Sequence, residues 1–193
     1  YQCSEGLFAM SIELSAYGNR IRQAYSHLRL RRFKAHSGWA FEDDVGLRKL
    51  LKIRLKSSDI VIDCGASIGE TTAVLARKHS KVFAFEPDKA AFEILEEKFF
   101  HRVNVVCINK AVLDQEKTVR LYLSEQRASS DALPPPAWWR YSKEAWYSVS
   151  SSVVSEKRGI TTDIWEEVET INLAEFILKL GSVVKILKMD IED

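Results

Sequence analysis

Residues 61–72, VIDCGASIGETT, join an apolar run to an acid and then to two glycines that lie four positions apart. An apolar run that ends in a glycine-rich turn is typical of a buried strand leading into a helix. A strand, a turn and a helix in this order form the first half of a βαβ unit, in which a second, parallel strand follows the helix. The segment therefore predicts a parallel sheet whose glycine turn is a candidate ligand site.

The sequence around this turn repeats the alternation of helix and strand. Apolar stretches such as IVI and VFAF are continuous, which indicates strands that are buried on both faces of a sheet. The sequence predicts an α/β fold with a doubly wound, mostly parallel sheet covered by helices on both sides. Helices are expected over residues 45–55, 68–79 and 88–100 and from a capping-box-like Asn172 to near Gly181, and strands over residues 59–63, 81–85, 104–108 and 184–193.

The N-terminal part of the chain has a different pattern. Residues 8–34 carry apolar side chains at alternating steps of three and four, which predicts an amphipathic helix. We expect a helical arm over residues 1–40 and one domain over residues 41–193. The arm is basic, with 11 Lys or Arg against 5 acids in residues 1–58. We attribute that charge to the solvated face of a helix that packs on the domain or on a second subunit of a homo-oligomer, and expect no nucleic acid partner; binding to a membrane surface or RNA is the alternative.

Composition restricts the compartment and the kind of site. No run of roughly 18 apolar residues is present, so no transmembrane segment is predicted. The cysteines at positions 3, 64 and 107 have neither metal-ligand spacing nor the pattern of a disulfide framework, which favours a reduced, cytoplasmic compartment and predicts no metal site. Because a doubly wound sheet continues beyond a central fourth strand, we expect further strands after residue 193.

Residues 124–160 interrupt the alternation with three consecutive prolines, a cluster of aromatic residues and a cluster of serines. Segments of this length in a compact domain are usually functional or disordered, and the aromatic content argues against disorder. Two interpretations remain open: the insertion contacts a substrate, or it packs on the domain. The candidate substrate residues are Trp138, Trp139, Trp146 and Ser151.

Two ligands fit a glycine turn after the first strand: the pyrophosphate of a dinucleotide and the methionine end of S-adenosylmethionine. A pyrophosphate site favours G-x-G-x-x-G, but Ser67 stands at the middle glycine and Asp63 would repel phosphate. A sulfonium ligand with an ammonium group is complementary in sign to Asp63. Glu86, at the end of the next strand, can accept hydrogen bonds from ribose hydroxyls, a feature shared by both ligand classes.

Five segments in order, VIDCGASIGETT, VFAFEPD, NVVCINKAVLD, ETINLAEFI and VKILKMDIED, resemble the FkbM family of S-adenosylmethionine-dependent methyltransferases over roughly residues 41–193. The resemblance implies a class I, Rossmann-like methyltransferase fold. The family pattern commonly has Asn where Ser67 stands, an acid where Ala174 stands and Gly where Asp193 stands. The cofactor-binding residues implied by the resemblance are Asp63, Gly65, Ala66, Ser67 and Gly69 at the methionine end, Glu86 at the ribose, and Asn109, Lys110 and Ala111 beside the adenine.

Methyl transfer is an in-line displacement, so an enzyme mainly aligns the acceptor and manages one proton. Asp190 and Glu192 are two positions apart on a strand end and point to the same side, at the edge where parallel sheets bind ligands. They are our predicted catalytic residues, with solvated acids at a strand end as the alternative. The resemblance implies methylation of oxygen, with a small-molecule or glycan hydroxyl as the acceptor.

Two other functions remain open from the sequence. One is a non-catalytic or incomplete methyltransferase-like binding module whose basic arm is the working surface. The other is an NAD-binding oxidoreductase, because an acid after the second strand is also found in dinucleotide-binding folds.

Overall fold

The computed structural model describes part of the chain, namely residue 50 and residues 52–77, 80–135, 140–155 and 159–191. The expected N-terminal arm, residues 1–40, and its amphipathic helix lie outside the described residues. Among the described residues, no helix combines the length and the apolar character that crossing a membrane would require.

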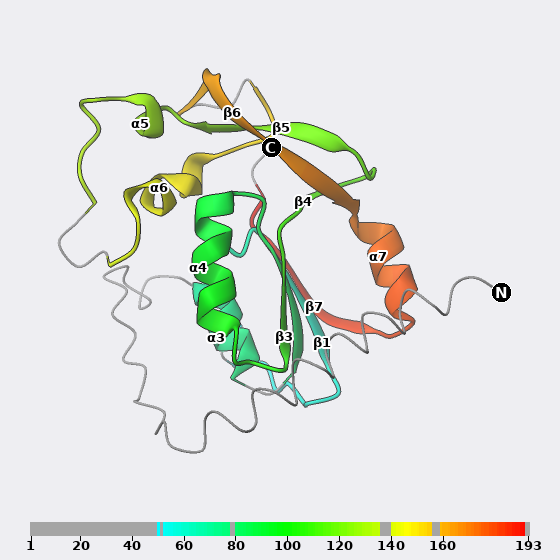
Figure 1. The fold of residues 1–193 in the computed structure, drawn as a ribbon. Helices are drawn as coiled ribbons and strands as arrows, with labels where there is room; N and C mark the ends of the chain where they lie inside the picture. The colour runs from blue at the N-terminus through cyan, green and yellow to red at the C-terminus, as the bar shows by residue number, and fades with distance from the viewer. Residues whose placement is uncertain (1–49, 51, 78–79, 136–139, 156–158, 192–193) are drawn as a thin grey trace. The chain divides into compact units, whose positions relative to one another are not determined.

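Four parallel strands form the sheet that the sequence predicts, in the order β3, β2, β1, β7 (Figure 1). β1 pairs with β2 on one side and with β7 on the other, so Asp63 on β1 lies beside Ala84 and Lys188. Among the described residues, β1 is the strand partner of β7. The strands span Ile60–Cys64 (β1), Lys81–Phe85 (β2), Val105–Ile108 (β3) and Val184–Met189 (β7).

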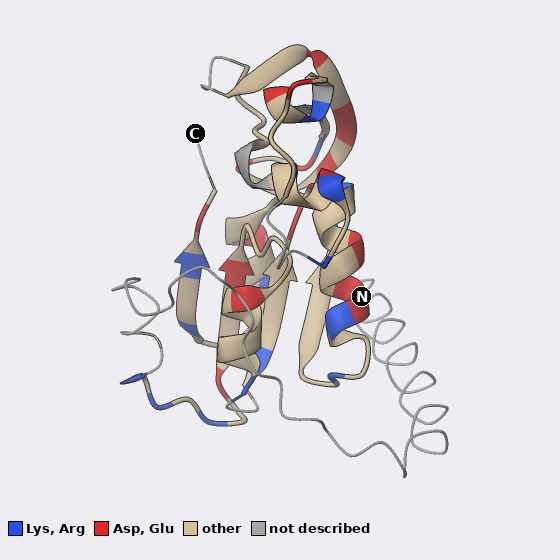
Figure 2. Cartoon of the chain, turned by 90° about the vertical axis from the view of Figure 1, so that its left-hand side faces the viewer, with Lys and Arg blue, Asp and Glu red and all other residues tan. Residues whose placement is uncertain are grey.

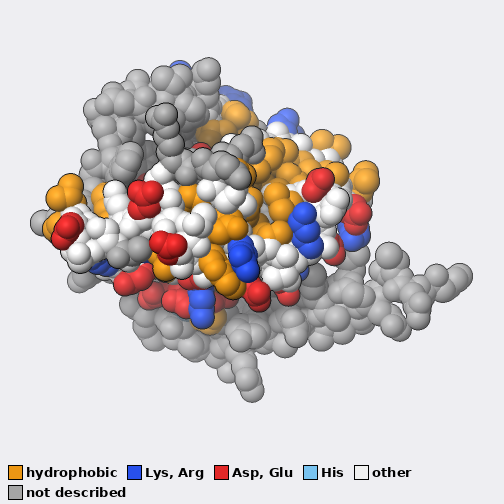
Figure 3. Space-filling model, turned by 90° about the horizontal axis from the view of Figure 1, so that it is seen from above, with side chains coloured by type: hydrophobic (Ala, Val, Ile, Leu, Met, Phe, Trp, Pro, Cys, Tyr) orange, Lys and Arg blue, Asp and Glu red, His pale blue; other side chains and the backbone are white. Residues whose placement is uncertain are grey.

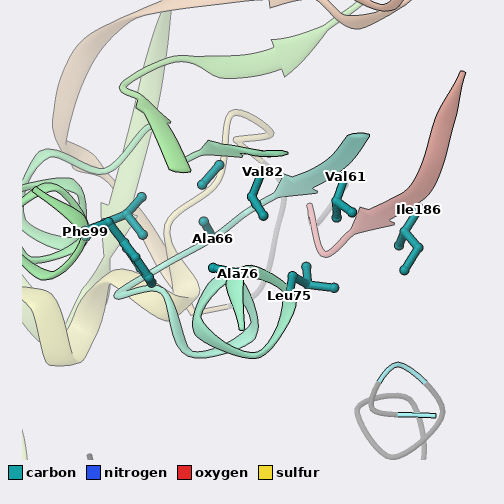
Figure 4. Packing of buried hydrophobic residues seen from close by; sticks show 9 residues of the cluster. Val61, Ala66, Leu75, Ala76, Val82, Phe99 and Ile186 are labelled. Carbon is teal, nitrogen blue, oxygen red and sulfur yellow. The ribbon is translucent and has the colours of Figure 1, made fainter. Parts of the chain in front are cut away.

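Helices cover both faces of this parallel sheet, because successive strand residues point to opposite faces and both sets are apolar. Val61 and Val82 belong to one core cluster with α3 and α4, whereas Ile62 and Phe83 belong to a second cluster with α7. Figure 1 shows α7 on the side of the sheet opposite to α3 and α4, and Figure 4 shows how the first cluster packs. The α/β fold class is confirmed. The helices span Glu70–Ala76 (α3), Lys89–Phe99 (α4) and Leu173–Leu180 (α7).

The ends of α4 and α7 follow signals in the sequence. Asp88 caps α4, because its side chain accepts hydrogen bonds from the first backbone N–H groups of the helix. Asn172 caps α7 by accepting a hydrogen bond from the N–H of Glu175 at 3.1 Å, which confirms the predicted start of this helix. Gly181 ends α7 in the left-handed conformation, with φ of 59°.

A second sheet of three strands, here called the outer sheet, has no counterpart among the strands expected from the sequence. β6 lies in its middle, parallel to β4 and antiparallel to β5. Figure 2 shows acidic residues in bands along β6, and Figure 3 shows hydrophobic and charged side chains mixed on the upper face of the molecule. β6 is half-exposed, so it lacks the continuous apolar run by which the sequence predicts the strands of the parallel sheet. The strands span Ala111–Leu113 (β4), Thr118–Ser124 (β5) and Ile160–Asn172 (β6).

Residues 125–159, here called the bridging segment, connect β5 to β6 and correspond to the expected insertion. The two ends of the segment lie side by side. Ser124 pairs with Ile160 in the strand ladder, and the N–H of Glu125 donates to the carbonyl of Gly159 at 3.0 Å. The segment therefore leaves the outer sheet and returns to it at neighbouring positions, and within it Ser152 also pairs with Tyr122 of β5.

The described part of the bridging segment packs on the domain. Ala145 is buried in a cluster with Ile68 and with Ala91 of α4. Tyr147 is buried too, and its hydroxyl donates to the carbonyl of Leu133. The helices span Glu125–Ala128 (α5), Lys143–Trp146 (α6) and the 3-10 turn Tyr147–Ser150 (η1).

Candidate functional site

A cavity of about 270 Å³ lies between the carboxyl ends of the parallel strands and the outer sheet. Residues that follow β1, β2 and β7 line one side of it, and residues of β4, β5 and the bridging segment line the other. Open parallel sheets bind ligands at this edge, so the cavity is the candidate site. Its polar lining includes Ser67, Glu86, Lys110, Ser148, Ser151 and Asp190, and its apolar lining includes Phe85, Val112, Leu121 and Val153.

The glycine turn, residues 65–69, excludes side chains at both glycines. Gly65 and Gly69 have φ angles of 71° and 80°, in the left-handed region that favours glycine. A Cβ on Gly65 would lie 2.1 Å from the carbonyl oxygen of Asp190, and one on Gly69 would lie 2.5 Å from a ring carbon of Phe99. Gly65 thus admits the end of β7 and lines the cavity, whereas Gly69 admits α4 and is not among the described lining residues.

Among the described residues, Ser67 is the only non-glycine residue with a positive φ angle, which is 49°. Asn tolerates this left-handed conformation better than most residues, which gives a physical reason for the Asn that the resemblance places there. Ser67 lines the cavity, and its N–H donates to Oε2 of Glu86 at 2.7 Å. Ala66, by contrast, is buried in the core beneath the turn.

Asp63 is fully buried at the end of β1 and already has partners within the chain. The hydroxyl of Thr72 donates to its Oδ2 at 2.6 Å, and the ammonium of Lys188 lies 3.1 Å from its Oδ1 as an ion pair. Oδ1 accepts no directed hydrogen bond from the described residues. Burial raises the pKa of Asp63, and the Lys188 charge opposes that rise. Asp63 does not line the cavity, so its predicted contact with a cofactor stays a prediction.

Glu86 combines burial with a place on the cavity wall. Its Oε2 accepts the hydrogen bond from Ser67, and its Oε1 accepts one from the N–H of Asp88 at 2.9 Å. Burial raises the pKa of Glu86 to about 7, although both backbone hydrogen bonds act in the opposite direction. Each carboxyl oxygen has a second lone pair, so Glu86 can accept further hydrogen bonds from a ligand.

The three residues predicted to flank an adenine lie between β3 and the outer sheet. The side-chain amide of Asn109 donates to the carbonyls of Glu86 and Pro87, at 2.8 and 3.1 Å, and so holds the end of β2 from outside the cavity. Lys110 lines the cavity and pairs with Glu169 of β6 at 2.8 Å. Ala111 starts β4 and lines the cavity as a small apolar residue.

One buried ion pair attaches the bridging segment to the parallel sheet. A terminal guanidinium nitrogen of Arg127 lies 2.7 Å from each carboxyl oxygen of Asp88, with 8% and 2% of the two side chains exposed. Arg127 also donates twice to the carbonyl of Glu144, at 3.0 and 3.2 Å, and the hydroxyl of Ser151 donates to Asp88 at 3.1 Å. Asp88 therefore holds both the start of α4 and the cavity wall near Ser151.

Of the two predicted catalytic acids, the structure describes Asp190. Asp190 lines the cavity with an exposed side chain, and its Oδ2 lies 3.6 Å from the ammonium of Lys188. Glu192 lies outside the described residues. Within the described part of the chain, no group of three or more His, Cys, Asp or Glu side chains could hold a metal ion.

Of the four predicted substrate residues, the structure describes Trp146 and Ser151. Trp138 and Trp139 lie outside the described residues. Trp146 is described and half-buried in α6, and it is not among the described residues that line the cavity, whereas Ser151 is. Ser151 uses its hydroxyl to hold Asp88, so its substrate role stays a prediction.

Three residues at the site are absent from the predicted set. Lys188 contacts the glycine turn, and Asp88 and Arg127 attach the bridging segment. β7 carries two lysines, Lys185 and Lys188, and the sequence alone does not show that Lys188 is the one that is largely buried. Asp88 is visible as a helix cap, but nothing local to the sequence pairs it with Arg127, 39 positions away.

Comparison with known proteins identifies a methyltransferase family. Residues 63–193 match the family described as the methyltransferase FkbM domain. Ribosomal RNA small subunit methyltransferase A of Thermotoga neapolitana is 34% identical over 76 residues, which is 38% of this chain and 29% of that protein. The protein of the same name from Caldanaerobacter subterraneus subsp. tengcongensis is 43% identical over 56 residues, which is 29% of this chain and 21% of that protein. The chain thus spans less than a third of the length of these curated relatives.

Among solved structures, the FkbM methyltransferase from Methylobacillus flagellatus KT aligns with 18% identity and a TM-score of 0.42, covering 74% of this chain and 28% of that chain. P. horikoshii TYW2, crystallised in complex with MeSAdo, aligns with 25% identity and a TM-score of 0.30, covering 34% of this chain and 26% of that chain. Members of methyltransferase families of this kind use S-adenosylmethionine. Since the family match takes in 63–193, more than half of the sequence, this chain belongs to the FkbM methyltransferase domain family.

Proposed function

We propose that this chain binds S-adenosylmethionine in the cavity and transfers its methyl group to a hydroxyl of a small molecule or glycan. The observation that carries the proposal is Glu86: a buried carboxyl group at the end of β2 that lines the cavity beside the glycine turn. A carboxylate at this place in an open parallel sheet accepts hydrogen bonds from ribose hydroxyls. The family membership supports a methyl donor over a dinucleotide.

The residues present fit such a cofactor by their chemistry. Apolar walls at Phe85, Val112 and Leu121 suit a flat base, and the carboxyl group of Glu86 suits a ribose. The exposed carboxylate of Asp190 lines the cavity and gives this edge a negative group that suits an ammonium group or a sulfonium. The bound cofactor supplies the activated methyl group, and the protein supplies its orientation.

Asp190 is the described residue that we propose for the acceptor. Its carboxylate is exposed, lines the cavity and lies at the carboxyl end of β7, where a group entering from solvent can reach it. A carboxylate there can accept a proton from a hydroxyl as the oxygen attacks the methyl group. The predicted second acid, Glu192, belongs to the same proposal.

The acceptor class rests on the resemblance to the FkbM family. The matched ribosomal RNA methyltransferases share at most 38% of this chain, so they support a common methyl-donor chemistry and carry no proposal of an RNA acceptor. The expectation of a small-molecule or glycan acceptor therefore stays our proposal.

Isothermal titration with S-adenosylhomocysteine tests the donor part of the proposal, with NADH as the matched control ligand. We expect saturable heat with S-adenosylhomocysteine and none with NADH. The reverse result would replace the proposal with the oxidoreductase alternative. Binding without methylation of any hydroxyl acceptor, in a form of the protein as long as its relatives, would favour the binding-module alternative.

A further inference from the structure

Lys188 connects three parts of the candidate site through one ammonium group. Its Nζ lies 2.8 Å from the carbonyl oxygen of Gly65 in the glycine turn, 3.1 Å from Oδ1 of Asp63, and 3.6 Å from Oδ2 of Asp190. Only 18% of the Lys188 side chain is exposed. A largely buried ammonium is costly unless it is paired, so this position is defined by its partners.

The backbone around Lys188 shows why these partners meet. The N–H of Asp190 donates to the carbonyl of Cys64 at 3.0 Å, so β7 continues to pair as β1 passes into the glycine turn. Gly65 carries no side chain at the point where the Asp190 carbonyl approaches it. The turn and the end of β7 are thus in direct contact. The Lys188 ammonium adds to that contact by donating to the Gly65 carbonyl and by pairing with Asp190.

The charges at this point differ from those that the sequence alone suggests. Asp63, predicted to attract a positively charged cofactor, is paired within the chain, with Thr72 on one oxygen and Lys188 beside the other. An ion pair has little net charge seen from a distance. Asp63 therefore acts on a ligand chiefly through the position that it gives to Lys188 and to the turn.

We propose that Lys188 is a positioning residue of the methyl-donor site, which fixes the glycine turn and the Asp190 end of β7 in one geometry. This inference rests on the proposed function, because it assigns a role within the site proposed there. Lys188 does not line the cavity, so it acts through the Gly65 carbonyl and through Asp190 rather than by contact with the donor.

The first experiment compares the affinity for S-adenosylhomocysteine of the wild type, Lys188→Met and Lys185→Met. Methionine is an unbranched side chain one heavy atom shorter than lysine, and it removes the charge. Lys185 is an exposed lysine on the same strand, so it is the matched control. We expect Lys188→Met to raise the dissociation constant about tenfold or more, as expected for loss of a charge-assisted hydrogen bond. Lys185→Met should stay within about twofold of the wild type.

The double variant Asp63→Asn/Lys188→Met separates positioning from simple charge balance. Lys188→Met alone leaves a buried, unpaired carboxylate and lowers the melting temperature, whereas the double variant removes both charges and recovers stability. We expect the double variant to recover stability while its affinity for S-adenosylhomocysteine stays weak, because the Gly65 carbonyl still lacks its donor.

The outcomes are distinct. Wild-type affinity in the double variant, or in Lys188→Met itself, would overturn the positioning role and leave the proposed function intact. A wild type that does not bind S-adenosylhomocysteine would overturn the proposed function and this inference together. Weak binding by both variants, with stability recovered in the double variant, supports the inference.

Discussion

The parallel sheet and the outer sheet border the same cavity, but they bury their strands differently. Four of the five residues in β1 are buried, and so are four of the five in β2, whereas β6 buries three of its 13. Strands buried on both faces require continuous apolar sequence, and a half-exposed strand does not. The parallel sheet carries the glycine turn and Glu86, while the outer sheet and the bridging segment supply the opposite wall. The comparison indicates that local sequence specifies the side of the cavity formed by the glycine turn and Glu86. Long-range polar contacts specify the opposite wall, which the outer sheet and the bridging segment form.

The strongest test of that comparison is the contact between the two regions. Arg127→Met removes the partner of the buried Asp88 carboxylate and should lower the free energy of unfolding by about 3–5 kcal/mol. Urea denaturation measures it. The control is Asp88→Asn/Arg127→Met, which leaves no unpaired charge and should lose much less. Equal losses in the single and double variants would show that the ion pair does not hold the wall.

Within the parallel sheet, Gly65→Ala tests the close approach of β7 to the glycine turn. A Cβ would collide with backbone, at 2.1 Å from the Asp190 carbonyl oxygen, so we expect a loss of about 2–4 kcal/mol in the free energy of unfolding. Gly181→Ala is the control, because Gly181 also has a positive φ but no neighbour within 4 Å of an added Cβ. It should lose about 1 kcal/mol. Equal losses would assign the whole effect to backbone conformation.

The pH dependence of stability should come mainly from Glu86, on the parallel-sheet side of the cavity. The folded-state pKa of Glu86 is raised from 4.5 to about 7, so the folded protein binds this proton more tightly than the unfolded chain does. Stability is therefore greatest below about pH 4.5 for this group and falls as pH rises toward 7, by on the order of 2–3 kcal/mol.

Urea denaturation of the wild type and Glu86→Gln between pH 5 and pH 8 measures this contribution. Glu86→Gln should flatten the decline, with the residual slope coming from Asp63, whose pKa is raised in the same direction by burial. A wild-type stability that rises with pH across this range would contradict the burial of Glu86.

Ligand affinity tests the same carboxyl group. Glu86→Ala should weaken S-adenosylhomocysteine by about 1.5–3 kcal/mol, because charge-assisted hydrogen bonds to the ribose are lost. Glu167→Ala, an exposed acid of β6, is the control and should leave the titration unchanged. A loss in dissociation constant below about tenfold for Glu86→Ala would argue against its ribose role.

The smallest effect is expected on the exposed face of the outer sheet. The guanidinium of Arg120 lies 4.3 Å from the centre of the Trp165 ring, and Trp165 is 40% exposed. Arg120→Met should lower the free energy of unfolding by about 0.5–1 kcal/mol. A double-mutant cycle with Trp165→Leu isolates the interaction. A coupling energy as large as that of Arg127 with Asp88 would mean that exposed contacts such as Arg120–Trp165 stabilise the outer sheet as much as the buried ion pair does.

The sequence predicts the parallel sheet because its signals are local. Runs such as VFAF indicate strands buried on both faces, and Asn172 with Glu175 marks the start of α7 within four residues. The glycine turn is visible for the same reason, since its glycines and Asp63 are contiguous. These features could be predicted without knowing which segments meet in space.

The outer sheet and the wall could not be predicted in that way. β6 mixes acids with apolar residues, and β4 has only three residues, so neither gives a clear period. The pairing of Arg127 with Asp88 joins positions 39 apart, and that of Lys188 with Asp63 joins two separate strands. Only the assembled fold brings these charges together, and whether the predicted site residues bind a ligand stays a prediction.

The closure of the bridging segment between Ser124 and Ile160 has an evolutionary consequence. Because its two ends are hydrogen-bonded neighbours, residues can be added to or deleted from its exposed part, such as residues 129–131, without displacing β5 or β6. Length changes in homologues are therefore expected in that exposed part, while Arg127 and Ala145 keep the rest of the segment attached.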